Sequence, residues 1–142
     1  MPQLISTSDE ETLARSAMYR LLARLLLREV DHELLQALSA TPVRSAYVEA
    51  GGVLPTGSEE NALEDLSIDY CQLFLGPSQH LPPYQSVWSS GEFHGTPVNS
   101  MQNFIDVAGY NTDVLPRRIM LDHLGVQLDW MGHVLFELAS CG

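Results

Sequence analysis

Asp122 and His123 form the pair in this chain that could most readily carry chemistry, since a carboxylate beside an imidazole can share proton transfer or bind a metal. They fall in LDHLGVQLDWM, residues 121–131, whose apolar spacing predicts a helix. Adjacent helical residues point about 100° apart, so both side chains cannot face one ion without ligands from elsewhere. The remaining histidines have no metal spacing among them. We therefore predict no catalytic residues, no metal ligands and no enzymatic activity.

A second group of residues suits binding. In YCQLFLGPSQHLPPYQSVW, residues 70–88, consecutive prolines fix φ, favour an extended backbone and would hold Tyr84 and Trp88 rigidly. Rigid aromatic side chains lose little conformational entropy on binding and are good anchors. The alternative is that these rings cover the core beneath a long loop, and the residues alone weigh the two equally.

Composition limits the classes of partner. At 142 residues with 45% apolar content, the chain suits one domain. Its 18 acidic and 7 basic residues, all of the latter arginine, give a net charge of -11. This charge argues against nucleic acid and anionic membranes as partners and favours a cationic partner such as a basic peptide. The alternative is that the acidity only keeps the protein in solution.

The chain is predicted to be cytoplasmic. Its two cysteines, Cys71 and Cys141, are too few and too far apart for a disulfide framework, which favours a reducing compartment. The first residues, MPQLISTSDEE, lack the basic and apolar regions of a secretory signal. No apolar stretch approaches the roughly 18 residues needed to span a bilayer, so stable membrane insertion is not expected.

Apolar periodicity and capping signals predict an all-α fold, a single-domain bundle of about five to six helices over residues 1–142. The first expected helix begins at the capping box of Ser8, and the second covers residues 31–40. The third runs from Ser58 to a stop at Gly76, the fourth from Thr96 to Gly109, and the last covers residues 116–140. The first helix is expected to be buried along most of its length, because two rows of apolar residues give it a wide apolar stripe.

Two further patterns leave alternatives open. Arg20, Arg24 and Arg28 recur every four residues, which fits either a phosphate contact or a solvated face paired with carboxylates, and the second is favoured. Gly125 and Gly132 in the last helix suggest close approach by another backbone, because glycine is costly in a helix interior. A neighbouring helix of the same domain is favoured over a bound peptide.

Two blocks of this sequence resemble the TorD/DmsD/NarJ-like family of redox-enzyme maturation proteins. One looks like the family block "Y..LF.GP....PPY.SV" and is carried by Tyr70, Leu73, Phe74, Gly76, Pro77, Pro82, Pro83, Tyr84, Ser86 and Val87. The other looks like "DHL...L..M" and is carried by Asp122, His123, Leu124, Leu128 and Met131. The resemblance covers roughly residues 8–139.

The resemblance implies a cytoplasmic chaperone that binds the twin-arginine signal peptide, or the apoprotein, of a molybdopterin-containing oxidoreductase and assists cofactor insertion and proofreading before export. Asp122 would accept hydrogen bonds from the basic region of the peptide. The residues that the resemblance places in the peptide site are Phe74, Pro83, Tyr84, Ser86, Trp88, Asp122, His123 and Gln127.

The resemblance also implies limits and alternatives. Members of the family continue past the last helix, so the chain is expected to lack the C-terminal helices and to leave the apolar stripe of residues 121–138 partly uncovered. It would then be a shortened form that forms a homodimer or swaps helices, or a fragment. No cofactor is expected, apart from weak guanine nucleotide binding known in the family. The alternative functions are a small GTP-binding or hydrolytic protein using Asp122 and His123, and a structural helical adaptor.

Overall fold

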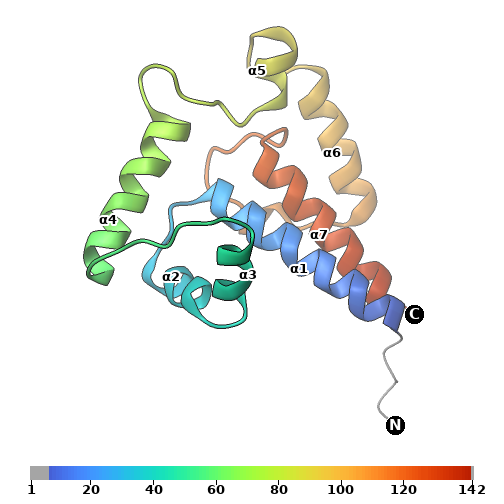
Figure 1. The fold of residues 1–142 in the computed structure, drawn as a ribbon. Helices are drawn as coiled ribbons and strands as arrows, with labels where there is room; N and C mark the ends of the chain where they lie inside the picture. Colours follow the sequence, from blue (N-terminus) through green and yellow to red (C-terminus); the bar gives the residue numbers. More distant parts are fainter. Residues whose placement is uncertain (1–6, 142) are drawn as a thin grey trace. The chain divides into compact units, whose positions relative to one another are not determined.

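The computed structural model describes residues 7–141 and confirms the all-α fold (Figure 1). Within this range the only β-type pairing is an isolated antiparallel bridge between Tyr84 and His123. The elements are α1 (Thr7–Leu27), α2 (His32–Ser39), α3 (Val43–Glu49), α4 (Glu59–Tyr70), the π-helical turn η1 (Cys71–Leu75), α5 (Gln85–Ser90), α6 (Thr96–Ala108), the 3-10 turn η2 (Thr112–Val114) and α7 (Leu124–Ser140).

Two short helices, α3 and α5, were missed by the sequence-based expectation of five to six helices. Both follow proline-containing segments that read as turns, and both are too short for apolar periodicity to be visible. The described residues divide into two compact units. Unit 1 comprises residues 7–28 and 82–141, and unit 2 comprises residues 29–81.

Unit 1 is built on α1 and α7, which run side by side (Figure 1). They are antiparallel, because the Cβ that Gly132 lacks would lie 3.1 Å from Ser16 O, whereas that of Gly125 would lie 2.6 Å from Leu27 Cγ. Ser16 Oγ also donates to Gly132 O at 2.6 Å. The preference for a neighbouring helix as the reason for both glycines is therefore confirmed.

The expectation that α1 is buried along most of its length is wrong. Only Ser16 and Ala23 of this helix are buried, and Met18 and Leu22 are exposed. The glycines of α7 leave room for Leu27, Arg20 and the backbone of Ser16 on α1, so the two helices approach closely there. Apolar spacing alone does not show which residues of α1 this close contact buries.

The arginines of α1 make contacts with a ring and with carbonyl oxygens of unit 1. The guanidinium of Arg20 lies 5.6 Å from the centre of the Phe136 ring on α7. Arg24 donates to Arg28 O at 3.2 Å, and Arg28 donates to Val114 O at 3.3 Å. The stripe therefore contributes to packing around α1, and its guanidinium groups are aimed at carbonyl oxygens and a ring.

The core of unit 1 lies between α6 and α7. It contains Met101, Ile105, Tyr110 and Val126, with Leu27, Leu115, Ile119, Leu121 and Trp130 packed against it. The hydroxyl of Tyr110 donates a hydrogen bond to the carboxylate of Asp129, and burial together with this bond raises the pKa of Tyr110. As predicted, Gly109 ends α6, with φ at 62°.

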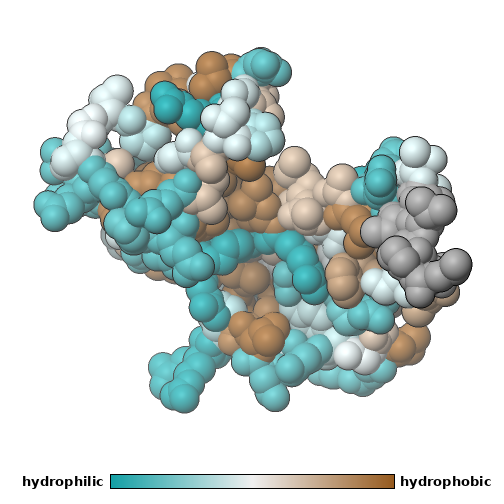
Figure 2. Space-filling view, turned by 90° about the horizontal axis from the view of Figure 1, so that it is seen from below, coloured by the Kyte–Doolittle hydropathy of each residue, from teal (hydrophilic) through white to brown (hydrophobic). Residues whose placement is uncertain are grey.

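The last helix begins at Leu124, not near Pro116. Arg118 has a φ of 66°, and the segment that follows it is extended or turned until His123 caps α7. The apolar stripe of residues 121–138 is partly uncovered, as expected, since Leu124, Met131 and Leu138 are exposed. Figure 2 shows apolar residues open to solvent among hydrophilic ones on the face that it presents.

Unit 2 holds α2, α3, α4 and η1. Asp31 caps α2 through Leu34 N, and Ser58 caps α4 through Asn61 N, so both predicted helix starts are confirmed. The imidazole Nδ1 of His32, at the start of α2, lies 2.8 Å from a carboxylate oxygen of Glu59, at the start of α4. None of the helices between residues 7 and 141 combines the length and the apolar character that crossing a bilayer requires.

Candidate functional site: the joined motif blocks

The two motif blocks of the sequence meet in unit 1 through their backbones. Tyr84 and His123 form the antiparallel bridge. On either side of it, Leu124 N donates to Pro83 O at 2.7 Å and Gln85 N donates to Asp122 O at 3.2 Å. The sequence predicted that the two blocks share one surface, and in the structure backbone hydrogen bonds join them.

Asp122 lies at the centre of this junction and is fully buried, with 0% of its surface exposed. Its Oδ2 accepts from Ser86 N at 2.8 Å, in the first turn of α5. Tyr84, the residue before α5, provides no side-chain cap. Asp122 therefore caps α5 from a distant part of the chain, where a negative charge is favourable. Its other oxygen, Oδ1, and the Ser86 hydroxyl are buried without a hydrogen-bond partner among the described residues.

His123 is a helix cap and not a surface group. Its Nδ1 accepts from Gly125 N at 2.9 Å at the start of α7, and only 4% of the residue is exposed. Burial lowers the pKa of the imidazole to about 4, although the Asp122 charge acts in the opposite direction. A neutral ring is what the contact requires, because Nδ1 needs a free electron pair to accept the amide proton.

Gln127 connects the two blocks a third time. Its side-chain amide donates to Asp122 O at 2.9 Å and to Gln85 Oε1 at 3.3 Å. An amide can bridge two acceptors in this way, which a carboxylate at the same position could not do. Gln127 therefore stabilises the junction through these two hydrogen bonds, although its side chain is only half-buried.

An aromatic segment, residues 82–93, projects from this junction. Tyr84 packs edge-on against His123, with 4.9 Å between ring centres, and against Phe93, with 5.3 Å between ring centres. Burial, followed by the Asp122 charge, raises the pKa of Tyr84. Trp88 on α5 is 68% exposed, and its indole N–H donates to Pro82 O at 2.7 Å. The hydrogen bond restrains a large ring whose faces remain open.

Phe93 was not predicted from the sequence. It is 56% exposed and follows Gly91, which ends α5 with a φ of 77°. The resemblance stopped at Val87, and no spacing rule connects an aromatic residue in a glycine-rich turn to one nine positions earlier. The aromatic content of EFHG was the one available signal.

Most of the predicted site residues lie together in unit 1. Those joined at the junction are Pro83, Tyr84, Ser86, Asp122, His123 and Gln127, with Trp88 beside them on α5. Phe74 belongs to unit 2, where its ring packs edge-on against Tyr70 at 5.1 Å. Asp122 and His123 differ from expectation because they do not sit on a helix and because their functional groups point into the junction.

The junction presents exposed aromatic rings, those of Trp88 and Phe93, and, among its described residues, no exposed catalytic group. Ser86 and His123 are both buried and held by backbone contacts, an arrangement that does not form a nucleophile and base facing solvent. Within residues 7–141, no three His, Cys, Asp or Glu side chains are grouped so that they could hold a metal ion.

Comparison with known proteins places these features in a family. The nitrate reductase delta subunit family matches residues 28–140. A protein named chaperone protein TorD from Shewanella sp. (strain MR-4) is 29% identical over 140 residues, which cover 85% of this chain and 66% of the relative. The protein of the same name from Photobacterium profundum is 27% identical, covering 87% of this chain and 64% of the relative. The chain thus spans about two thirds of the length of these relatives.

A solved structure shows a similar fold. The protein is from Archaeoglobus fulgidus and is named as a redox enzyme maturation protein. The TM-score is 0.57 at 19% identity, over 83% of this chain and 69% of the other. The similarity at this identity concerns the fold alone. The family match covers both motif blocks and most of the chain, and it confirms the relationship that the blocks indicated: this chain belongs to the nitrate reductase delta subunit family, which includes TorD-like chaperones.

Proposed function

We propose that this chain is a cytoplasmic, non-enzymatic chaperone that binds the twin-arginine signal peptide, or the apo-form, of a molybdopterin-containing oxidoreductase subunit and assists cofactor insertion and proofreading before export. The observation that carries the proposal is the restrained, exposed Trp88 beside Tyr84 and Phe93. Fixed aromatic rings suit the apolar stretch of a signal peptide. The relatives named as chaperones support the general class.

Within this proposal, Glu92 replaces Asp122 as the group that meets the arginines of the peptide. Asp122 has no exposed surface, whereas Glu92 is exposed, is adjacent to Phe93 and is the only acidic residue of the aromatic segment. An exposed carboxylate can pair with an arginine without first leaving a buried hydrogen bond. Asp122 would act indirectly, by holding α5 and hence Trp88 in place.

A labelled twin-arginine signal peptide from a molybdoenzyme, titrated with the full chain and followed by fluorescence anisotropy, tests the proposal. We expect binding at low salt that weakens as salt is added. Trp88→Ala should weaken binding about tenfold or more, since an aromatic anchor contributes about 2 kcal/mol. Val107→Ala, which removes part of an even more exposed apolar side chain on α6, should leave binding unchanged. Absence of binding at low salt, or equal loss in both variants, would contradict the proposal.

The role of Glu92 has its own test. Glu92→Gln should reduce both the affinity and the dependence of binding on salt, because one charge pair is lost. Asp122→Asn should leave the salt dependence unchanged. The reverse pattern would restore the direct role of Asp122. Guanine nucleotide binding stays a prediction, and calorimetry with GTP and magnesium measures it directly.

A further inference from the structure

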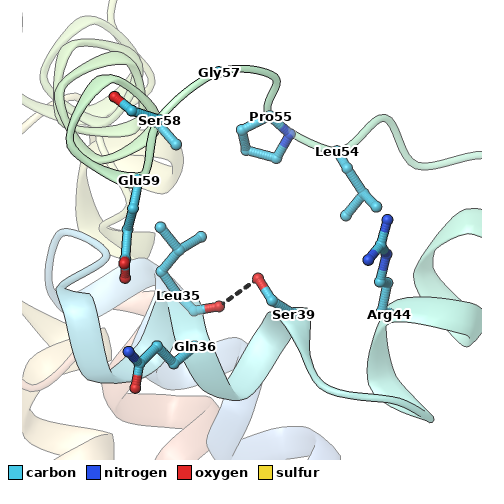
Figure 3. Close-up of a pocket in the computed structure, with 10 residues that line it drawn as sticks. Leu35, Gln36, Ser39, Arg44, Leu54, Pro55, Gly57, Ser58 and Glu59 are labelled. Carbon is cyan, nitrogen blue, oxygen red and sulfur yellow. Dashed lines mark hydrogen bonds between the residues drawn. The ribbon is translucent and has the colours of Figure 1, made fainter.

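A pocket of about 340 Å³ lies within unit 2, separate from the aromatic segment (Figure 3). Its walls come from α2, the start of α3, the segment of residues 54–58 and the start of α4. Leu35, Leu54, Pro55 and Ala62 make much of the lining apolar. The volume is at the lower end of the range for sites that bind small molecules or single side chains.

The polar groups on the α2 and α4 walls already have partners. Ser39 Oγ donates to Leu35 O at 2.7 Å, which Figure 3 draws as a dashed line. The carboxylate of Glu59 is paired with His32, and the Gln36 amide lies 2.9 Å from the other nitrogen of that imidazole. These groups stabilise unit 2 itself.

Arg44 on the remaining wall is different. It is the only basic residue among residues 29–81, which contain nine carboxylates. Even so, its guanidinium has no hydrogen-bond or ion-pair partner among the described residues. Figure 3 shows its side chain extending beside Leu54, across the pocket from Glu59. A guanidinium at an apolar wall offers a fork of N–H donors that matches a carboxylate.

The surrounding charge narrows the class of ligand. Nine carboxylates in one small unit repel an anion, and the repulsion grows with each further negative charge. Phosphates and nucleotides are disfavoured on this ground, and a single carboxylate with an aliphatic group beside it is preferred. Such a pair of groups occurs where a polypeptide ends on an aliphatic residue, and the open pocket lets the chain continue outward.

We infer that this pocket of unit 2 binds the end of a peptide, with its terminal carboxylate on Arg44 and an aliphatic side chain against Leu35, Leu54 and Pro55. The site is a second point of contact with a polypeptide, and it does not depend on the aromatic segment. The inference therefore stands or falls independently of signal-peptide binding.

Nuclear magnetic resonance of the full, isotope-labelled chain tests the inference. The probe is acetyl-leucyl-leucine with a free carboxylate, and the comparisons are its C-terminal amide and isovalerate. We expect the free acid to shift the amide signals of Gln36, Ser39 and Ala62 and the side-chain signal of Arg44. The affinity of the amide should be lower by about tenfold or by a greater factor, because the amide loses a charge-assisted hydrogen bond. Isovalerate, which lacks the peptide unit, should also bind more weakly.

Variants separate the charge from the pocket. Arg44→Gln should remove the preference for the acid over the amide, and Arg44→Lys should retain part of it, since the charge remains and the fork is lost. Arg117→Gln, an exposed arginine of unit 1, should bind both probes as the wild type does. Each variant is checked by circular dichroism for an unchanged melt. No shift with the acid, equal affinity for acid and amide, or isovalerate binding as tightly as the peptide would overturn the inference.

Discussion

Replacing Asp122 by alanine should destabilise unit 1, and the structure sets the size of the effect. The change removes the only side-chain acceptor of Ser86 N, and Ser86 has 0% of its surface exposed, so the amide cannot bond to water. A buried hydrogen bond to a charged group contributes about 1.5–3 kcal/mol. Loss of the negative charge at the start of α5 adds a few tenths of a kcal/mol or more. Removing the unpartnered Oδ1 offsets part of this, which leaves about 2 kcal/mol.

Urea unfolding followed by tryptophan fluorescence measures this effect within unit 1. Both tryptophans of the chain, Trp88 and Trp130, belong to unit 1, so unfolding of unit 2 does not contribute an intrinsic tryptophan signal. Asp122→Ala should lower the urea midpoint, Asp122→Asn should lower it less because one acceptor oxygen is kept, and Asp113→Ala on the exposed η2 turn is the control.

The same variants distinguish a positioning role from direct recognition. If Asp122→Ala left the urea midpoint unchanged while peptide affinity fell, the assignment of Asp122 as a cap of α5 would be refuted, and a direct contact with the peptide would be needed.

Three further predictions follow from the packing and the titrating groups of unit 1. The pKa of His123 is about 4 when folded and near 6.5 when unfolded, so the unfolded state takes up a proton first. The contribution of neutral His123 to the free energy of unfolding is complete above pH 6.5 and falls by about 3 kcal/mol as the pH drops to 4. The urea midpoint should therefore decline less across this range in His123→Gln than in the wild type, and an equal decline would contradict the assignment. Gly125→Ala should destabilise unit 1 by about 1–3 kcal/mol despite the better helix propensity of alanine, because the added Cβ would lie 2.6 Å from Leu27 Cγ. Gly109→Ala serves as a comparison, since its added Cβ meets no neighbour and only its φ of 62° causes strain. A calorimetric melting temperature that rises for Gly125→Ala would show that α1 can move away from α7. Tyr110→Phe removes the hydrogen bond to Asp129 and should cost about 1–2 kcal/mol in the same melt, and an unchanged melt would mean that this bond is not formed in solution.

The elements with strong local signals were predictable from the sequence. Asp31 and Ser58 cap helices, and Gly109 ends one, because side chains or glycine freedom next to the helix determine these boundaries. The start of α7 was not predictable in this way. The backbone of Asp122 and His123 is used in the bridge to the proline segment, and that contact overrides the helical propensity of residues 116–123.

The site was predicted as a set of residues but not as an arrangement. The resemblance identified Tyr84, Trp88, Asp122 and His123, and no local pattern indicates that Asp122 caps a helix 36 residues earlier in the chain. For the same reason the sequence could not tell a recognition carboxylate from a buried one. Burial is a property of the surrounding fold, and the residue types on either side of Asp122 are compatible with both.

The bridge between Tyr84 and His123 also defines how unit 1 can open. The amides of Gln85, Ser86 and Leu124 all donate across this one junction, so their hydrogen exchange should be coupled in a single opening event. The packing of α1 against α7 does not involve these bonds and can persist while the junction is open. We therefore expect a partly open form of unit 1 in which α1 and α7 stay packed together while α5, with Trp88, is released as one piece.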